Sequence, residues 1–193
     1  MYRYRKFLEE KGYDVSKQWA EFCQRTEHRK FLQNDIIIPT GEKNNNIYIL
    51  ENGCVRYFTF NDGKEYTHDI LEAPYAFASM YGIDANEIST VNIQALTDAD
   101  VYILKPDDAQ YLNTKYPGFR QIGERSFSEI AKNRIIQGGK IKMMSPTERY
   151  LDFMENRPGL ANLIPQYIIA SYLGITPESL SRIRKRLYKK AGN

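Results

Sequence analysis

The side chains with the most informative chemistry lie close to the C-terminus, in the run PESLSRIRKRLYKK. With a helical period of 3.6, Leu180, Ile183 and Leu187 share one face, and the opposite face is polar and mostly basic. Arginine can donate two hydrogen bonds to guanine, glutamate can accept from cytosine, and serine can contact a base or a phosphate. The residues that could contact DNA in this way are Thr176, Glu178, Ser179, Ser181, Arg182, Arg184, Lys185, Arg186 and Lys189.

A second helix is predicted just before this one, beginning at about Pro165. Ala170 is small enough for another helix to cross closely above it, and Gly174 can adopt the left-handed backbone of a tight turn. Thr176 is a suitable cap for the following helix. A plain amphipathic hairpin would not need a small residue, a glycine and two apolar residues at these distances. The spacing therefore predicts a helix-turn-helix whose second helix enters the major groove of DNA.

The charge of the chain is unevenly distributed along the sequence. The 193 residues carry a formal net charge of +3. Residues 156–193 contain seven basic residues and one acidic residue, a net charge of +6, which leaves −3 for the other residues. A basic C-terminal segment on a mildly acidic body favours a polyanionic partner, although a solvated basic tail would have the same composition.

The remaining sequence predicts a β-structure between helices. Residues 1–27 show helical spacing, and from about Arg29 short runs of β-branched and aromatic residues alternate with turn residues, among them Asp62-Gly63. Many short strands at this spacing predict an antiparallel sandwich or small barrel. Residues 117–144 predict one long helix, in which Gly138-Gly139 marks either a bend or the helix end. Ser145 and Glu148 can form a capping box for the next helix.

These segments together resemble the Crp/Fnr family of bacterial transcription regulators. The resemblance rests on IPQYIIASYLGITPESLSRIRKRL for the helix-turn-helix, and on GEKNNNIYILENGCVRYFTFNDGKEY and NIQALTDADVYILKPDD for a β-roll. It implies an α+β fold with three parts: a jelly-roll-like sensor domain with N-terminal helices (1–116), a dimerisation helix (117–144) and a winged-helix-like helix-turn-helix domain (145–193). Because the chain ends soon after the recognition helix, no substantial C-terminal wing is expected.

The cyclic nucleotide site of this family is altered in the sequence. Members that bind cyclic nucleotides carry Phe-Gly-Glu and, about ten residues later, Arg-Ser-Ala, whereas this chain has Phe77-Ala78-Ser79 and Ser89-Thr90-Val91. Serine cannot replace the arginine that pairs with a cyclic phosphate. We therefore predict that neither cyclic AMP nor cyclic GMP is the effector; an apolar or aromatic effector and a region filled by its own side chains both stay open. The residues assigned to this effector region are Arg56, Phe77, Ser79, Met80, Tyr81, Ser89 and Thr90.

Several other classes of function are disfavoured by the sequence. His28 and His68 lie forty residues apart with no ligand motif, and Cys23 and Cys54 form no CxxC pair, so we expect no metal, no cofactor and a reducing compartment, the cytoplasm. We find no phosphate-binding glycine loop and no nucleophile elbow, so an enzyme is not expected. No run of residues has the apolar length of a membrane span.

The sequence therefore predicts a cytoplasmic homodimer that binds palindromic double-stranded DNA and regulates transcription. RNA polymerase and a small-molecule effector of unknown identity are further partners that the resemblance implies. The alternative is a sensor or interaction module whose basic C-terminal helix binds a protein or a membrane surface. A membrane-binding helix would need a broad exposed apolar face, whereas Leu180, Ile183 and Leu187 are needed for packing on the preceding helix.

Overall fold

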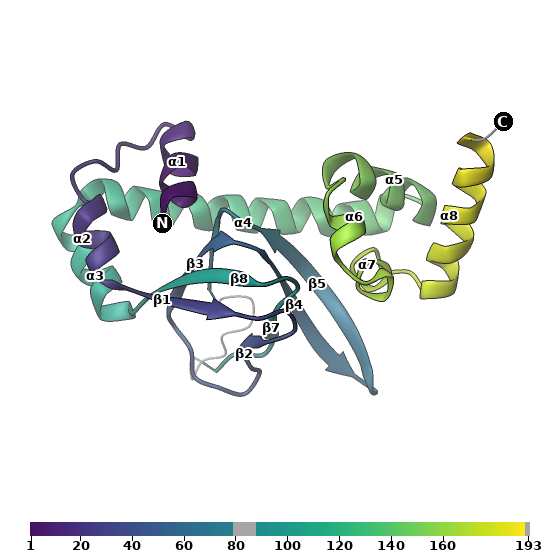
Figure 1. Cartoon of the computed structure of the whole chain (residues 1–193), viewed down its shortest axis with the longest axis horizontal. Helices are drawn as coiled ribbons and strands as arrows, with labels where there is room; N and C mark the ends of the chain where they lie inside the picture. Colours follow the sequence, from purple (N-terminus) through teal and green to yellow (C-terminus); the bar gives the residue numbers. More distant parts are fainter. Residues whose placement is uncertain (79–87, 192–193) are drawn as a thin grey trace.

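The structure, a computed structural model, describes residues 1–78 and 88–191 and is built around a roll of two four-stranded sheets (Figure 1). The sheet orders are β1-β8-β3-β6 and β2-β7-β4-β5, and the paired strands are antiparallel. The strands are β1 (Thr26–Phe31), β2 (Ile36–Ile38), β3 (Ile47–Asn52), β4 (Cys54–Asn61), β5 (Lys64–Glu72), β6 (Tyr75–Ala78), β7 (Asn92–Ala95) and β8 (Ala99–Leu104). The predicted α+β fold with an antiparallel β-roll is confirmed.

The interior of the roll is a packed apolar core. Successive side chains of a strand point to opposite faces, so alternate residues such as Tyr48 and Leu50 of β3 enter the space between the sheets. They meet Val55 and Tyr57 of β4 and Phe77 of β6, and the rings of Tyr48 and Phe77 stack with centroids 5.2 Å apart. The hydrophobic effect of this burial holds the two sheets together.

Two boundaries in the roll show where local patterns succeed and fail. The hairpin between β4 and β5 turns at Asp62 and Gly63, which both have positive φ (49° and 72°), as the Asp-Gly signal predicts. The prediction that residues 1–27 are all helical is wrong, because β1 already begins at Thr26. Strand β1 pairs with β8 along its whole length, from Thr26 opposite Leu104 onward, and this long-range pairing overrides the local helical spacing.

Two N-terminal helices, α1 (Tyr2–Glu10) and α2 (Trp19–Gln24), lie at one end of the molecule (Figure 1). The N-terminus of α1 is capped by a carboxylate from β3: Glu51 accepts the backbone N–H groups of Arg3 at 2.6 Å and Tyr4 at 3.1 Å. Glu51 is buried, and these hydrogen bonds satisfy donors that a helix leaves free at its first turn. They fix α1 to the roll.

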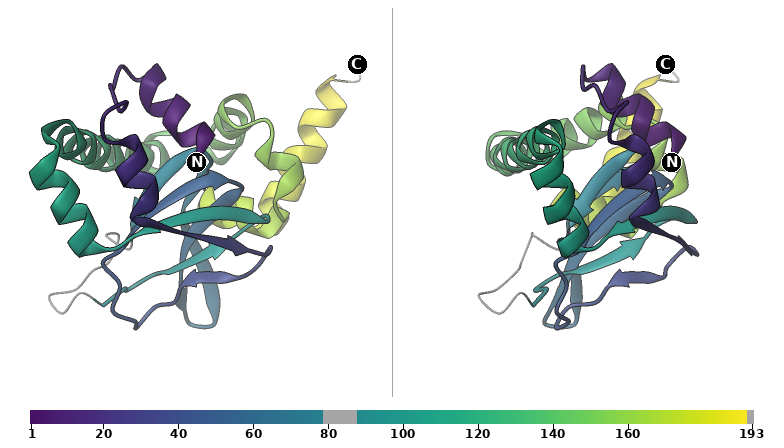
Figure 2. Two further views of the ribbon diagram at one scale, coloured as in Figure 1. Left: turned by 60° about the vertical axis from the view of Figure 1, so that its left-hand side comes forward. Right: turned by 90° about the vertical axis from the view of Figure 1, so that its left-hand side faces the viewer.

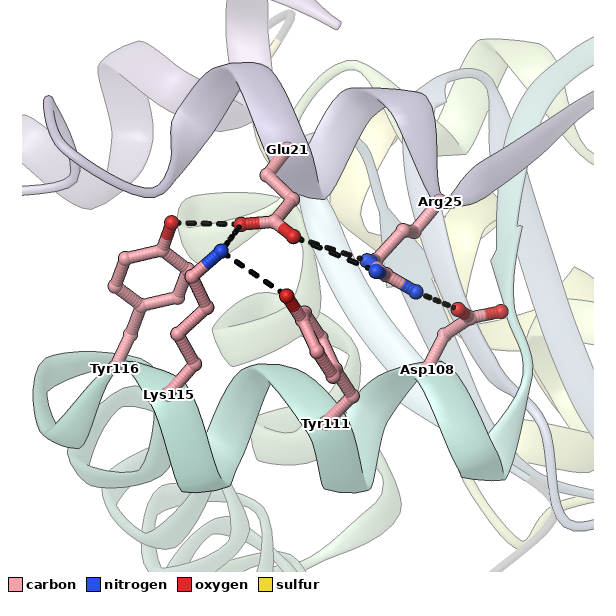
Figure 3. A network of polar contacts seen from close by, with 6 residues as sticks. All are labelled: Glu21, Arg25, Asp108, Tyr111, Lys115 and Tyr116. Carbon is pink, nitrogen blue, oxygen red and sulfur yellow. Dashed lines mark hydrogen bonds and ion pairs between the residues drawn. The ribbon is translucent and has the colours of Figure 1, made fainter.

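The long helix begins beside a polar network between α2 and α3 (Pro106–Lys115), shown in Figure 3. Glu21 accepts hydrogen bonds from Lys115 at 2.8 Å and from the Tyr116 hydroxyl at 2.7 Å, and Arg25 pairs with Asp108 at 2.6 Å. Lys115 and Tyr116 lower the pKa of Glu21 to about 2. Because Tyr116 directly precedes α4 (Pro117–Met143), the network fixes where the long helix starts.

The long helix carries the chain to four helices at the other end of the molecule (Figures 1 and 2). Helix α4 is continuous through Gly138-Gly139 as far as Met143, so the alternative that it ends at the glycine pair is wrong. Ser145 and Glu148 form the predicted capping box. The four helices, which we call the helix-turn-helix unit, are α5 (Pro146–Asn156), α6 (Leu160–Leu163), α7 (Gln166–Tyr172) and α8 (Pro177–Ala191).

The network at Glu21 predicts a specific acid dependence of stability. A carboxyl pKa that is lower in the folded state than its ordinary value of 4.5 stabilises the fold above about pH 4.5, and this contribution is lost as the pH falls toward 2. We expect Glu21→Gln to be less stable than the wild type at pH 7 and to lose less stability between pH 4.5 and 2. Chemical unfolding at a series of pH values measures this.

The control for this experiment is Glu124→Gln, which removes a well-exposed carboxylate that pairs with Arg120 within α4. It should leave the acid dependence as it is in the wild type. An identical acid dependence in Glu21→Gln and in the wild type would contradict the assignment of a low pKa to Glu21.

Candidate DNA-binding site and effector region

The turn between α7 and α8 has the geometry that the sequence predicts for a helix-turn-helix. Gly174 has φ of 65°, and the N–H of Ile175 donates to the carbonyl of Ala170 at 3.0 Å, which closes the end of α7. The Thr176 hydroxyl accepts the N–H of Ser179 at 3.2 Å and caps α8. Ala170 is fully buried, which leaves space for α8 to pack closely against α7.

Helix α8 buries its apolar side and exposes its polar side. Leu180 and Ile183 are 1% and 6% exposed, and they pack in a cluster with Phe153, Ile169 and other apolar residues of the unit. Ser179 and Arg184 are half-buried. The exposed members of the predicted set are Thr176, Glu178, Ser181, Arg182, Lys185, Arg186 and Lys189. The structure thus brings the predicted set together on α8 and its cap.

Hydrogen bonds arrange part of this polar face. Arg182 donates a hydrogen bond to the Ser179 hydroxyl at 3.3 Å, and the Thr176 hydroxyl donates to the same oxygen at 3.1 Å. Hydrogen bonds with its own backbone N–H and with Thr176 lower the pKa of Glu178, so this carboxylate is charged near neutral pH. Arg186 instead donates to the Thr147 hydroxyl of α5, and it must leave that contact to reach a phosphate.

The structure separates the residues that the sequence assigns to the effector region. Phe77 lies in the core of the roll. Arg56 lies on the opposite face of β4 from Val55 and Tyr57, so it does not point into the roll interior. Thr90 is exposed. Ser79, Met80 and Tyr81 fall in 79–87, outside the described residues.

Arg56 is fully engaged by neighbouring side chains. It is 1% exposed, and its guanidinium donates to Gln94 at 2.8 Å, to Thr67 at 3.3 Å and to Glu65 at 2.6 Å. The group also lies over the ring of Phe58, 4.1 Å from the centroid. Freeing this buried charge to bind an anion would leave Glu65 without its partner, which makes such a role costly.

Ser89 likewise forms hydrogen bonds with neighbouring backbone groups. It is 1% exposed, its hydroxyl donates to the carbonyl of Val91 at 2.8 Å, and its N–H donates to the carbonyl of Glu42 at 2.9 Å. Its own carbonyl accepts from Gly41 at 2.8 Å. Ser89 therefore holds the local backbone in place, and its hydroxyl is not directed at a ligand.

A cleft of about 900 Å³ lies between α4, the roll and the helix-turn-helix unit. Its lining includes Ile49 of the roll, Ile122 and Gly138 of α4, and Arg149 and Tyr172 of the unit. Within the described residues, no group of three or more His, Cys, Asp and Glu side chains is placed to hold a metal ion. In the same part of the chain, no helix has the length and apolarity to cross a membrane.

Sequence reasoning missed the side chains that join the helix-turn-helix unit to the roll. The Ser171 hydroxyl accepts the N–H of Thr67 at 2.8 Å and donates to the carbonyl of Glu65 at 3.1 Å. Arg157 donates to the carbonyl of Ile70 at 2.6 Å. All three partners are backbone groups of β5, the last strand of its sheet. These contacts join positions about a hundred residues apart in the sequence, and no local sequence motif predicts them.

Comparisons with known proteins agree with this architecture. Residues 28–115 match the family described as "Cyclic nucleotide-binding domain". A search of curated proteins finds no significant match.

Solved structures of similar fold include a CooA mutant from Carboxydothermus hydrogenoformans (TM-score 0.74, 17% identity, covering 91% of this chain and 82% of that one). FixK2 from Bradyrhizobium japonicum has TM-score 0.72 and 17% identity over 86% of each chain. A regulator of the Crp/Fnr family from Eubacterium rectale has TM-score 0.71 and 16% identity, covering 95% of this chain and 87% of that one.

A β-roll, a long helix and a C-terminal helix-turn-helix together define the architecture of Crp/Fnr-type regulators, and this chain has that fold. The resemblance inferred from the sequence is confirmed, and the matched residues 28–115 fall within the roll and α3.

The effector region predicts that cyclic nucleotides bind poorly. A cyclic phosphate needs a paired cation when it leaves water. The residue at the arginine position of the family is Ser89, and its hydroxyl already donates a hydrogen bond to the carbonyl of Val91. Losing one charge-assisted hydrogen bond costs about 1.5–3 kcal/mol before desolvation is counted. We expect calorimetric titration with cyclic AMP or cyclic GMP to show millimolar or weaker affinity. Adenosine, which lacks the phosphate, is the control, and a micromolar one-to-one isotherm for either cyclic nucleotide would overturn the prediction.

Proposed function

We propose that the protein is a sequence-specific DNA-binding transcription regulator of the Crp/Fnr type, which binds palindromic operators as a homodimer and is not controlled by cyclic AMP. The observation that carries the proposal is the division of α8, whose apolar side is buried against α7 while Glu178, Arg182 and Lys185 are exposed. A helix of this kind, held at a fixed angle by the turn at Gly174, is suited to the major groove.

The order of side chains along α8 assigns their roles. The N-terminal residues of a recognition helix lie deepest in the groove, so Glu178 and Arg182 would contact base edges. The basic residues further along, Arg184, Lys185, Arg186 and Lys189, would contact phosphates and release counterions. The net charge of +6 on residues 156–193 supports this division, because it places the positive potential on the segment that would meet DNA.

A homodimer would be built on the second half of α4. Among the side chains that the structure describes in this half, four large apolar ones are exposed: Ile135 (77%), Ile136 (45%), Ile141 (51%) and Met143 (87%). Exposed apolar residues gathered on one half of a helix are typical of a surface that another chain covers. We take a second copy of the chain to cover this surface, because a palindromic operator has two equivalent half-sites. One short recognition helix has little contact area with DNA, and two-fold symmetry doubles that area.

The alternative function, binding of α8 to a membrane or a protein surface, has less support. A membrane-surface helix needs a broad free apolar face. Leu180 and Ile183 are buried inside the unit, and the exposed positions along α8 are mainly charged or hydroxylic. We therefore favour DNA as the partner.

The proposed roles within α8 predict two different mutational effects. Arg182→Ala should weaken binding by about 1–3 kcal/mol and relax the base preference at one operator position. Lys189→Ala should weaken binding to all sequences alike and reduce the slope of log affinity against log salt by about one. Fluorescence anisotropy with operator variants at several salt concentrations measures both.

The matched control is Arg120→Ala, which removes an exposed arginine near the start of α4, where it pairs with Glu124. It should change neither affinity nor base preference. Unchanged affinity and base preference in Arg182→Ala would show that the assignment of the base-contacting residues is wrong.

The dimer interface is tested by placing a charge among the exposed apolar residues of α4. Ile135→Glu should convert a dimer into a monomer at micromolar concentration, because the carboxylate would be buried without a partner. Gln121→Glu adds the same charge in the first half of α4 and should stay dimeric. Analytical ultracentrifugation distinguishes these states. A monomeric wild type that still binds palindromes tightly would contradict the proposed dimer.

A further inference from the structure

One arginine of α5 contacts the ends of two other helices. The Arg149 guanidinium donates to the carbonyls of Ile141 at 3.2 Å and Met144 at 2.7 Å, in the last turn of α4 and directly after it. Its Nε donates to the carbonyl of Leu173 at 2.8 Å. Leu173 is the C-cap residue of α7 and directly precedes Gly174. A single side chain therefore joins the end of α4 to the turn of the helix-turn-helix.

The carbonyls that Arg149 contacts are acceptors that need such a partner. The last four carbonyls of a helix have no N–H partner within the helix, and the negative end of the helix dipole lies at the same place. Ile141 is one of the last four residues of α4, and Leu173, at the end of α7, is only 5% exposed. One cation thus satisfies acceptors at two helix ends and interacts favourably with both dipoles. Because Arg149 is half-buried, water screens these hydrogen bonds less than it would at the surface.

The shape of the guanidinium suits it to fix an angle between helices. The group is planar and its N–H donors have fixed directions, so donors on Nε and Nη1 constrain the carbonyls of two helices relative to each other. The compact ammonium group of a lysine would keep the charge without this fixed geometry. The backbone of Arg149 is itself held in place, because its N–H donates to the carbonyl of Ser145 at 3.0 Å in the capped first turn of α5.

A second contact at this corner joins α4 to α5. Lys140 binds both carboxylate oxygens of Asp152, at 2.7 and 2.8 Å, and Asn156 donates to the same carboxylate at 3.2 Å. This ion pair lies between α4 and α5. Arg149 extends the connection to α7, and α8 packs against α7 through the apolar cluster of the unit. The position of α8 relative to α4 therefore depends on Arg149.

We propose that Arg149 is a positioning residue for DNA recognition. By fixing the turn before α8 to the end of α4, it sets the separation of the two copies of α8 in the homodimer, and hence the half-site spacing that the protein selects. The proposal rests on the proposed function, because that separation is defined by the pairing of two α4 helices. Arg149 acts on spacing and not on base choice within a half-site, since the bases are contacted by α8.

The first test needs no DNA. Spin labels at Gln121→Cys in the first half of α4 and at Ser181→Cys on the exposed side of α8 report the distance between these helices by double electron–electron resonance. The background carries Cys23→Ser and Cys54→Ala, and labelled protein is diluted into unlabelled protein so that both labels of a measured pair lie in one chain. The background protein should give one narrow distance distribution. Arg149→Ala should give a distribution roughly twofold wider, because the supporting hydrogen bonds are lost.

The second test measures the consequence for DNA. The palindrome that the wild type selects is prepared in duplexes whose half-sites are moved together or apart one base pair at a time. Arg149→Ala should reduce the preference for the selected spacing over the neighbouring ones roughly tenfold, the scale of one hydrogen bond to a charged group. It should keep the wild-type base preference on a duplex with a single half-site. Arg149→Lys, which retains the charge without the planar group, should give an intermediate preference.

The matched control is Lys142→Ala, which removes an exposed cation from the same last turn of α4. Any electrostatic effect of this loss should weaken binding to all duplexes alike. The distance distribution and the relative preference among spacings should stay as they are with Lys142 in place.

Equal distance distributions with and without the Arg149 side chain would overturn the proposal, and so would an unchanged spacing preference. Loss of base preference on the single half-site would also overturn it, because Arg149 would then hold the helix-turn-helix itself together. If Arg149→Ala does not fold, Arg149→Lys is judged by the same outcomes. A wild type that selects no common sequence contradicts the proposed function, and the distance measurement then still decides whether Arg149 fixes the position of α8 relative to α4.

Discussion

The free edge of β5 is the constraint on which the arrangement of the two ends of the molecule depends. An edge strand presents backbone N–H and C=O groups that need partners, and exposed edges favour unwanted pairing between chains. Here Ser171 satisfies an N–H and a C=O of β5 with a single hydroxyl, and Arg157 satisfies a further C=O. The helix-turn-helix unit thus covers the edge, and the covering sets its position on the roll.

This docking leaves the polar face of α8 exposed. The unit uses α7 and the residues before it to contact β5, whereas α8 contributes its apolar side to the internal cluster of the unit. Two different faces therefore serve two different contacts, one with the roll and one with DNA in the proposed function. Arg56 is buried and its partner Glu65 is partly exposed. The two residues lie in β4 and β5 close to this contact, since the carbonyl of Glu65 accepts the Ser171 hydroxyl.

The helix-turn-helix could be predicted from the sequence because its determinants are local. Ala170, Gly174 and Thr176 act within a few residues of one another, through sterics, left-handed backbone and capping. The hairpin at Asp62-Gly63 and the capping box at Ser145 were predictable for the same reason.

Features that depend on tertiary pairing were not predictable in this way. Nothing in the sequence around Arg56 says which face of β4 points inward, and only the packing of Val55 and Tyr57 into the core places the arginine outside. Strand β1 begins at Thr26 because β8 lies beside it. The contacts of Ser171 with β5 likewise depend on a strand about a hundred residues away.

The most direct test of the proposed function is selection of bound duplexes from a random DNA pool with purified, ligand-free protein. We predict that the selected duplexes share a palindrome whose half-sites lie one helical turn apart, roughly 34 Å, because two copies of α8 related by a two-fold axis would contact them. Recovery of no common sequence, with binding that depends only on salt and DNA length, would contradict sequence-specific recognition by α8.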